Sequence, residues 1–297
     1  MPDPIQGRVV VSYGREVIVE TGDGGLTACL MRRRGGERPV CGDVVSWRPT
    51  GDAGGVIERV EPRTTLIERG DFRGRPRPLA ANVDVMIMVV AEPPGADTTL
   101  IDRYLALAGH VGLATVLLVN KADRLDETGR ERLEHTLAFY REELAQPLVF
   151  ASARDSDGLD DLSEHLQART AIFVGHSGVG KSSLVNALVP ELDLRIGALS
   201  ATSGQGRHTT TATTLFHLPH GGHIIDSPGV RTLRLDHLPR SAVMRAFPEV
   251  ERHRHACRFN DCRHNGEPGC AVAGALERGE IPPERYHSLQ TLLAEAS

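Results

Sequence analysis

Short runs of alternating apolar and polar residues, separated by glycine-rich turns, fill the N-terminal part of the chain. Such runs are typical of short β-strands with one buried face. Five of them in so short a region suit a small barrel, so we expect an OB-fold over residues 1–66. An SH3-like barrel would show almost the same pattern. The strands are expected at 8–13, 16–20, 26–31, 43–47 and 56–60.

Residues 67–82 show no hydrophobic period and combine prolines with several arginines, which predicts a basic linker. From residue 83 to 235 the pattern changes to short apolar runs that alternate with amphipathic segments. This alternation predicts a three-layer α/β domain with a mainly parallel sheet. Residues 236–297 are helical in pattern and basic, with a cluster of cysteine and histidine. We expect strands at 83–90, 115–119, 148–151, 171–174, 213–218 and 223–225, and helices at 100–109, 126–144, 159–166 and 181–188.

The composition narrows the class of protein. The chain has 297 residues, 40% hydrophobic and 25% charged, which excludes a disordered chain and a disulfide-stapled miniprotein. A net charge of −5 excludes a uniformly basic nucleic-acid coat but allows local basic patches. No secretory signal is visible, and the most apolar stretch, 83–91, is shorter than the roughly 20 residues of a membrane span. We therefore expect a cytoplasmic protein without membrane contact.

A phosphate-binding loop is the clearest motif. The segment fits the pattern G-x-x-x-x-G-K-[ST] between a predicted strand and a predicted helix. The glycines allow backbone N–H groups to face inward, where the helix N-terminus adds partial positive charge. Lys181 should reach the β- and γ-phosphates, and the Ser182 hydroxyl should ligate Mg²⁺. The loop comprises Gly175, His176, Ser177, Gly178, Val179, Gly180, Lys181, Ser182 and Ser183.

Two further segments indicate guanine rather than adenine. Asn120, Lys121, Ala122 and Asp123 follow the strand predicted at 115–119. A carboxylate at Asp123 can accept hydrogen bonds from N1–H and the N2 amino group of guanine, and adenine offers no such pair of donors. The next strand ends in a loop whose backbone N–H can meet the guanine O6. That loop contains Ser152 and Ala153.

The remaining nucleotide contacts are expected in two switch segments. Asp226 suits a water-mediated contact with Mg²⁺, and the Gly229 N–H can sense the γ-phosphate. Thr210 is our choice for the second Mg²⁺ hydroxyl, with Thr209 and Thr211 as alternatives.

Hydrolysis should be slow in the isolated chain. Val230 stands where many GTPases carry a glutamine that orients the attacking water. His208 is the best internal candidate for positioning that water, although it could equally contact RNA or merely pack against its surroundings.

The order of these motifs is circularly permuted. Most small GTPases place the phosphate loop first, whereas here the base motif at 120–123 precedes it. A permutation keeps the contacts of the site and moves only the chain ends. The segment after Gly229 now leads directly into the C-terminal region, so we expect a short covalent route between them at 230–237.

Three cysteines and a histidine near the C-terminus predict a structural Zn²⁺ site. Cys257, Cys262, His264 and Cys270 supply soft ligands for four-coordination within 14 residues. The spacing leaves no open coordination position, so a catalytic role for this metal is not expected. The alternative ligands are His253, His255 and His287.

With these motifs the chain resembles, nearly end to end, the ribosome small-subunit-dependent GTPase A family (RsgA, also called YjeQ), which are circularly permuted bacterial GTPases. The resemblance also covers 81–84, 102–105, 206–211 and the segments 257–264 and 267–270 around the cysteines. It implies an OB-fold, a permuted GTPase domain and a C-terminal zinc subdomain. It further implies GTP hydrolysis stimulated by the 30S subunit and contact with 16S rRNA late in subunit maturation. We expect a monomer that exchanges GTP and GDP.

Two other functions remain possible from the residues. A P-loop ATPase or kinase with a zinc module would not use Asp123 to read the base. A G protein that docks only protein partners, with its barrel as an interaction module, would not bind 30S subunits in a salt-sensitive way.

Overall fold

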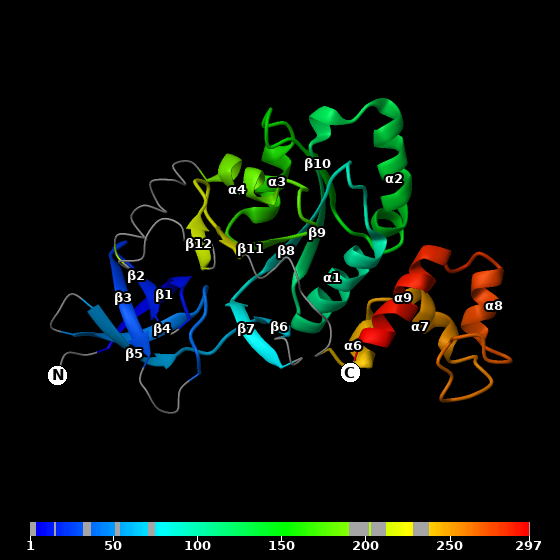
Figure 1. Cartoon of the computed structure of the whole chain (residues 1–297), viewed down its shortest axis with the longest axis horizontal. Helices are drawn as coiled ribbons and strands as arrows, with labels where there is room; N and C mark the ends of the chain where they lie inside the picture. The colour runs from blue at the N-terminus through cyan, green and yellow to red at the C-terminus, as the bar shows by residue number, and fades with distance from the viewer. Residues whose placement is uncertain are drawn as a thin grey trace.

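The computed structural model shows three regions along the chain (Figure 1). A barrel of strands lies at one end, a sheet flanked by helices lies in the middle, and a group of short helices lies at the other end. The structure describes residues 4–14, 16–31, 37–50, 54–70, 75–189, 202, 212–227 and 238–296.

The N-terminal region is a closed five-stranded barrel. Its strands are adjacent in the order β1-β2-β3-β5-β4, and pairing of β1 with β4 closes the barrel. This order, with β3 parallel to β5, is that of an OB-fold and not of an SH3-like barrel. Trp47 lies in the barrel core, where a Cβ on Gly55 would come within 2.4 Å of its ring, so only glycine fits there. The strands are β1 (Ile5–Ser12), β2 (Glu16–Thr21), β3 (Leu26–Met31), β4 (Val44–Thr50) and β5 (Gly54–Val60).

The expected basic linker is instead a hairpin, so that prediction was wrong. Strands β6 (Leu66–Gly70) and β7 (Pro76–Ala81) pair antiparallel in a separate two-stranded sheet. Both are edge strands, and proline is tolerated on an edge because no ladder hydrogen bond is lost there. Ile67 and Leu79 are buried, so only one end of the hairpin carries the apolar pattern of a strand.

The middle region is a three-layer α/β fold, as predicted. Its strands are adjacent in the order β10-β9-β8-β11-β13-β12, and the described pairings are parallel except that of β12 with β13. The strands are β8 (Val85–Val90), β9 (Ala114–Asn120), β10 (Leu148–Ala151), β11 (Thr170–Val174), β12 (Thr213–His217) and β13 (His223–Asp226). The helices are α1 (Thr98–Val111), α2 (Glu127–Glu142), α3 (Leu159–Leu166) and α4 (Lys181–Leu188), with a short 3-10 turn η1 (Ala122–Arg124).

The period of two along β8 explains the layers. Val85, Ile87 and Val89 belong to the core that also contains α3 and α4. Met86, Met88 and Val90 alternate with them and belong to the core that contains α1 and α2. A strand buried on both faces reads as a continuous apolar run, which is the pattern of a central parallel strand.

The barrel and the α/β region share one sheet in the part of the chain that is described. Strand β1 pairs antiparallel with β12 through Val11–Thr214 and Ser12–Thr213. The result is a continuous sheet of eleven strands that runs from β10 to β4.

The described C-terminal helices are α6 (Arg240–Arg245), α7 (Pro248–Arg254), α8 (Ala271–Glu277) and α9 (Pro283–Glu295). Of these four, α6 and α9 pack against α1, and α7 packs against α6 and α8. Arg285 of α9 is buried with two carboxylates: it pairs with Asp102 of α1 and, at 2.7 Å, with Glu249 of α7. Among the described helices, none is both long enough and apolar enough to cross a bilayer.

Candidate nucleotide and metal sites

The predicted site segments meet at the carboxyl ends of the parallel strands. Strand β9 leads into the base motif, β10 into the second base loop and β11 into the phosphate loop. In register, Ala151 at the end of β10 pairs with Asn120 at the end of β9, so these two loops start side by side. Open α/β sheets bind ligands at this edge.

The phosphate loop adopts the backbone that its glycines predict. Gly175, Gly178 and Gly180 all have positive φ, at 140°, 85° and 91°. A Cβ at Gly180 would lie 2.3 Å from Asn120 Nδ2, so a side chain there would push the base motif away. Helix α4 begins at Lys181 without a side-chain cap, which leaves its first N–H groups directed to the loop.

Lys181 reaches across the loop. Its Nζ donates to the carbonyl oxygens of Gly175 at 2.7 Å and His176 at 2.6 Å. The ammonium is therefore held over the cradle in which an anion would sit.

The base motif is fastened to the phosphate loop by two hydrogen bonds. Asn120 is buried, and its Nδ2 donates to the Val179 carbonyl at 2.8 Å. Lys121 has a φ of 63°, and its Nζ donates to the Gly178 carbonyl at 2.7 Å. The base motif thus holds the phosphate loop in place, in addition to placing Asp123 at the edge of the sheet.

Ser152 holds Asp123. Its hydroxyl donates to Asp123 Oδ1 at 2.8 Å and accepts from the N–H groups of Arg154 and Asp155 at 3.2 and 3.1 Å. Ser152 itself is buried, whereas Asp123 is exposed. Ser152 therefore orients the Asp123 carboxylate from the protein side, and the solvent side of the carboxylate is open to a ligand. The sequence predicted that these two loops would meet, but not this contact.

Part of the predicted site lies outside the described residues: His208, Thr209, Thr210, Thr211, Gly229 and the segment 230–237. The structure does place Asp226 at the end of β13, with its side chain exposed. The next residue, Ser227, is buried and bonds Thr213 at 2.9 Å, which joins the ends of β12 and β13.

Two contacts with the phosphate loop were missed by sequence reasoning. The Tyr104 hydroxyl accepts the Gly175 N–H at 3.2 Å, and Asp97 Oδ2 lies 3.0 Å from His176 Nε2. Asp97 also caps α1 through the Leu100 N–H. Burial raises the pKa of Asp97, but its hydrogen bonds from His176 and Leu100 outweigh this effect and leave that pKa below its usual value. The helix N-cap pattern before residue 98 was the available signal.

The four predicted zinc ligands come together. Ligand atoms of Cys257, Cys262, His264 and Cys270 all lie within 4.8 Å of one another. The sulfurs of Cys257 and Cys270 are 3.5 and 3.7 Å from His264 Nδ1. A tetrahedral Zn²⁺ with ordinary bond lengths requires about 3.6 Å between sulfur and nitrogen ligands. The donor set and its spacing thus fit a metal ion of this type.

Groups around the metal cluster hold it in place. The His264 carbonyl accepts from Tyr286 and, at 2.8 Å, from Gln290 Nε2, both on α9. The Glu267 carboxylate accepts the N–H groups of Arg263 and Asn265. Within the described residues, the candidate cluster does not include the alternative ligands His253, His255 and His287.

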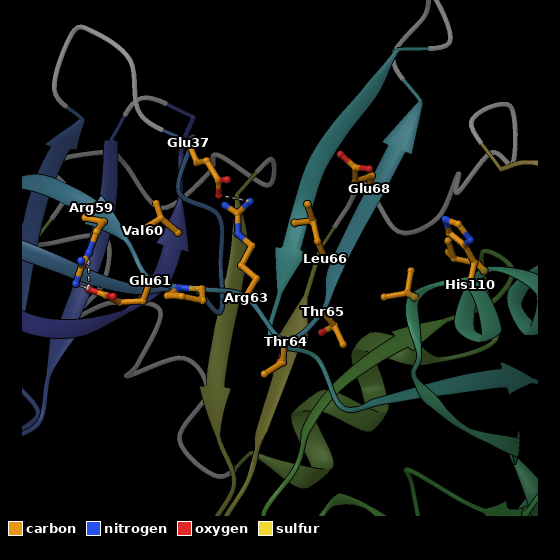
Figure 2. Close-up of a pocket in the computed structure, with 13 residues that line it drawn as sticks. Glu37, Arg59, Val60, Glu61, Arg63, Thr64, Thr65, Leu66, Glu68 and His110 are labelled. Atoms are coloured by element: carbon orange, nitrogen blue, oxygen red, sulfur yellow. Dashed lines mark hydrogen bonds and ion pairs between the residues drawn. The ribbon is translucent and has the colours of Figure 1, made fainter.

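A cavity of about 660 Å³ lies away from both sites, between the barrel, the β6–β7 hairpin and the end of α1 (Figure 2). Its walls carry both signs of charge, and Figure 2 shows Arg59 turned to Glu61 and Arg63 to Glu37. None of the predicted nucleotide-site residues that the structure describes lines it. The described part of the candidate site therefore lies elsewhere.

Comparison with known proteins agrees with this geometry. The family model described as RsgA GTPase matches residues 60–236. The small ribosomal subunit biogenesis GTPase RsgA of Pseudomonas fluorescens (strain SBW25) is 45% identical over 291 residues, which cover 97% of this chain and 84% of that protein. The protein of the same name from Azotobacter vinelandii is also 45% identical over the same shares.

Two solved structures have the same fold. The crystal structure of YjeQ from Thermotoga maritima superimposes with a TM-score of 0.77 at 32% identity, over 98% of each chain. YloQ, described as a circularly permuted GTPase, gives 0.71 at 26% identity and covers 98% of this chain and 94% of its own. From its motifs, the permuted order of its strands and these matches, the chain belongs to the RsgA family of GTPases.

Proposed function

We propose that this protein binds GTP at the sheet edge and hydrolyses it while bound to the small ribosomal subunit, as a checkpoint late in maturation of that subunit. The observation that carries the proposal is the Asp123 carboxylate, held by Ser152 next to a glycine-rich phosphate loop. The relatives' name, small ribosomal subunit biogenesis GTPase, supports the partner.

The side chains divide the work of nucleotide binding. Asp123 accepts from N1–H and N2 of guanine, and the N–H of Ala153 meets O6. Lys181 and the N–H groups of residues 176–183 hold the β- and γ-phosphates, and Gly175 begins the loop. Ser182 and Thr210 would ligate Mg²⁺, with Asp226 contacting it through water; the metal would neutralise charge on the phosphates when bound. The Gly229 N–H would meet the γ-phosphate.

Hydrolysis requires help from the partner. Val230 cannot orient a water molecule, so the free protein should turn over slowly. His208 is the residue we assign to positioning the attacking water. Docking on the subunit would bring the segments that carry His208 and Gly229 into their active arrangement.

The C-terminal cluster would hold one structural Zn²⁺ through Cys257, Cys262, His264 and Cys270. Few apolar residues lie between 255 and 270, so metal ligation would supply the free energy that folds this segment. We assign residues 1–66 to the barrel, 83–235 to the GTPase domain and 236–297 to the zinc subdomain.

Basic segments at both ends of the GTPase region favour 16S rRNA as the direct partner. Residues 63–77 hold five arginines against two acidic residues, and 252–264 hold four against one. Contacts of arginine with phosphate make binding sensitive to salt. We place the protein in the cytoplasm, as a monomer. A protein partner without rRNA contact is the alternative, and salt-insensitive binding to the 30S subunit would favour it.

The decisive experiment is the rate of GTP hydrolysis with and without purified 30S subunits. We expect a stimulation of at least tenfold by 30S and none by 50S subunits. The matched control is Lys181→Met, which should abolish the stimulated rate. An equal rate with and without 30S subunits would contradict the proposal.

A further inference from the structure

Helix α1 contacts the phosphate loop along one of its faces. Asp97 caps the helix and Tyr104 lies seven residues later, two turns along, so both side chains share a face. They contact consecutive residues of the loop: Tyr104 bonds the N–H of Gly175 at 3.2 Å, and Asp97 bonds the side chain of His176 at 3.0 Å.

A second face of α1 is fixed by the C-terminal helices. Thr99 lies 3.2 Å from the Ser288 hydroxyl, Asp102 pairs with Arg285, and Arg103 pairs with Glu295 at 2.7 Å. All three partners belong to α9. Contacts with α9 on the face of α1 that points away from the phosphate loop therefore keep α1 in place against the loop.

The junction at Gly175 is closed. Tyr104 is 2% exposed, and the space between it, the end of β8 and the loop amounts to about 10 Å³. A water molecule needs two to four polar partners, and the side chains around this space are mainly apolar, among them Met88, Val90 and Ile101, so water is a poor substitute for the phenol oxygen. On the other side, a Cβ on Gly175 would lie 2.2 Å from the Val89 carbonyl. Burial raises the pKa of Tyr104 to about 12, so the phenol keeps its proton at neutral pH.

We propose that Tyr104 is a positioning residue for the GTPase reaction, which holds the first N–H of the phosphate loop and so preforms the loop for GTP and GDP alike. This inference rests on the proposed nucleotide site. A loop that is already ordered costs less to occupy, so the benefit falls on binding and not on the chemical step.

The test is Tyr104→Phe, which keeps the ring and removes only the hydroxyl. Loss of one hydrogen bond to a buried N–H should weaken binding of both GDP and a non-hydrolysable GTP analogue about five- to tenfold. In 30S-stimulated turnover, KM should rise while kcat stays within about twofold. Tyr140→Phe is the matched control: it removes another buried tyrosine hydroxyl, bonded to Asp102 at 2.8 Å, and should leave nucleotide affinity unchanged.

Three results would overturn the inference. The first is unchanged affinity in Tyr104→Phe with only a lower Tm, which indicates a structural role. The second is a fall in kcat at constant KM, which indicates a role in the chemical step. The third is a failure of the wild-type protein to bind any guanine nucleotide. This result would overturn the proposed function as well, and it differs from the first two because it is seen without any variant.

Amide hydrogen exchange of the wild-type protein tests the same contact without a variant. We expect the Gly175 N–H to be protected in the nucleotide-free protein, and the N–H of the exposed Ser177 to exchange rapidly. Equally rapid exchange at both positions would contradict the proposal.

Discussion

In the proposed nucleotide site, specificity for guanine depends on the carboxylate of Asp123. Asp123→Asn keeps the hydrogen bond from Ser152, because the amide oxygen can still accept it, but presents an NH₂ group where guanine has donors. Two hydrogen bonds to a charged group are lost, about 3 kcal/mol in total, so GDP should bind roughly a hundredfold more weakly. Xanthosine diphosphate, with a carbonyl at C2, should now bind more tightly than GDP. Titration of both nucleotides measures the exchange of preference.

The control for this variant is Asp155→Asn, which changes an exposed carboxylate outside the base motif. It should bind GDP like the wild type. A parallel loss of both nucleotides in Asp123→Asn would show that the residue supports the loop and does not read the base.

At the residue scale, sequence reasoning predicted segments that the structure brings together, but it missed contacts that hold them in place. The phosphate loop and base motif could be predicted because each follows a fixed spacing of residues along the chain. Tyr104 and Gly175 are 71 residues apart, and no spacing rule connects them. Their contact depends on how α1 lies against the end of β11, which only the tertiary structure defines.

At the scale of elements, most helices and strands were predicted because each has one clear period. Helices α3 and α4 begin and end where the pattern places them, and the sheet is mainly parallel, as the alternation of strands and helices predicts. The β6–β7 hairpin was not predicted from the sequence. Pro76, Pro78 and the arginines interrupt the apolar pattern at the exposed end of β7, so only its buried end resembles a strand. The packing of α9 against α1 was also not predicted, because it depends on the buried ion pairs of Arg285 with Asp102 and Glu249.

Loss of the cation from that charge cluster should be strongly destabilising. Removal of Arg285 leaves Asp102 and Glu249 buried without their cation, which costs about 3–5 kcal/mol. We expect Arg285→Met to lower the urea midpoint markedly at pH 7. Arg278→Met, which breaks an exposed pair with Glu280, should leave the urea midpoint close to that of the wild type.

The cost of Arg285→Met should depend on pH. Burial already raises the pKa of Asp102, and Arg285 is the main influence that opposes it. Without Arg285 that pKa rises further, so the folded variant takes up a proton at a higher pH than the unfolded chain. The free energy of unfolding that the variant loses relative to the wild type should therefore become smaller as the pH falls from 7 towards 5. A deficit that is constant over this range would show that lost packing and not uncompensated charge causes the effect.

At the scale of the whole molecule, the join between the barrel and the α/β region contains a half-buried histidine. His223 on β13 lies against Arg8 of β1, whose Nη1 is 3.0 Å from His223 Nε2, and its ring is 4.8 Å from that of His217. Glu20 of β2 completes the group, 2.7 Å from His217. Burial, then the charge of Arg8 and then His217 lower the pKa of His223 to about 4.

This histidine should make the join sensitive to acid. The unfolded chain binds a proton near pH 6.5, whereas the folded protein does not until about pH 4, so stability falls as the pH drops through that window. For a half-buried ring, solvent screening reduces the effect to the order of 1 kcal/mol. His223→Asn should lose less stability than the wild type between pH 7 and pH 5, measured by urea unfolding. His220→Asn, at an exposed turn, should behave like the wild type, and identical pH profiles for all three would refute the assignment.

The pairing of β1 with β12 has a consequence for any shortened form of the chain. A protein without residues 1–66 would present the backbone of Thr213 and Thr214 as an unpaired sheet edge. Such an edge is a template on which another chain can add a strand, and natural proteins cover or charge their edges to prevent this. The barrel therefore shields the α/β sheet from self-association, and selection for solubility would keep the two units together even where nucleotide turnover alone did not require it.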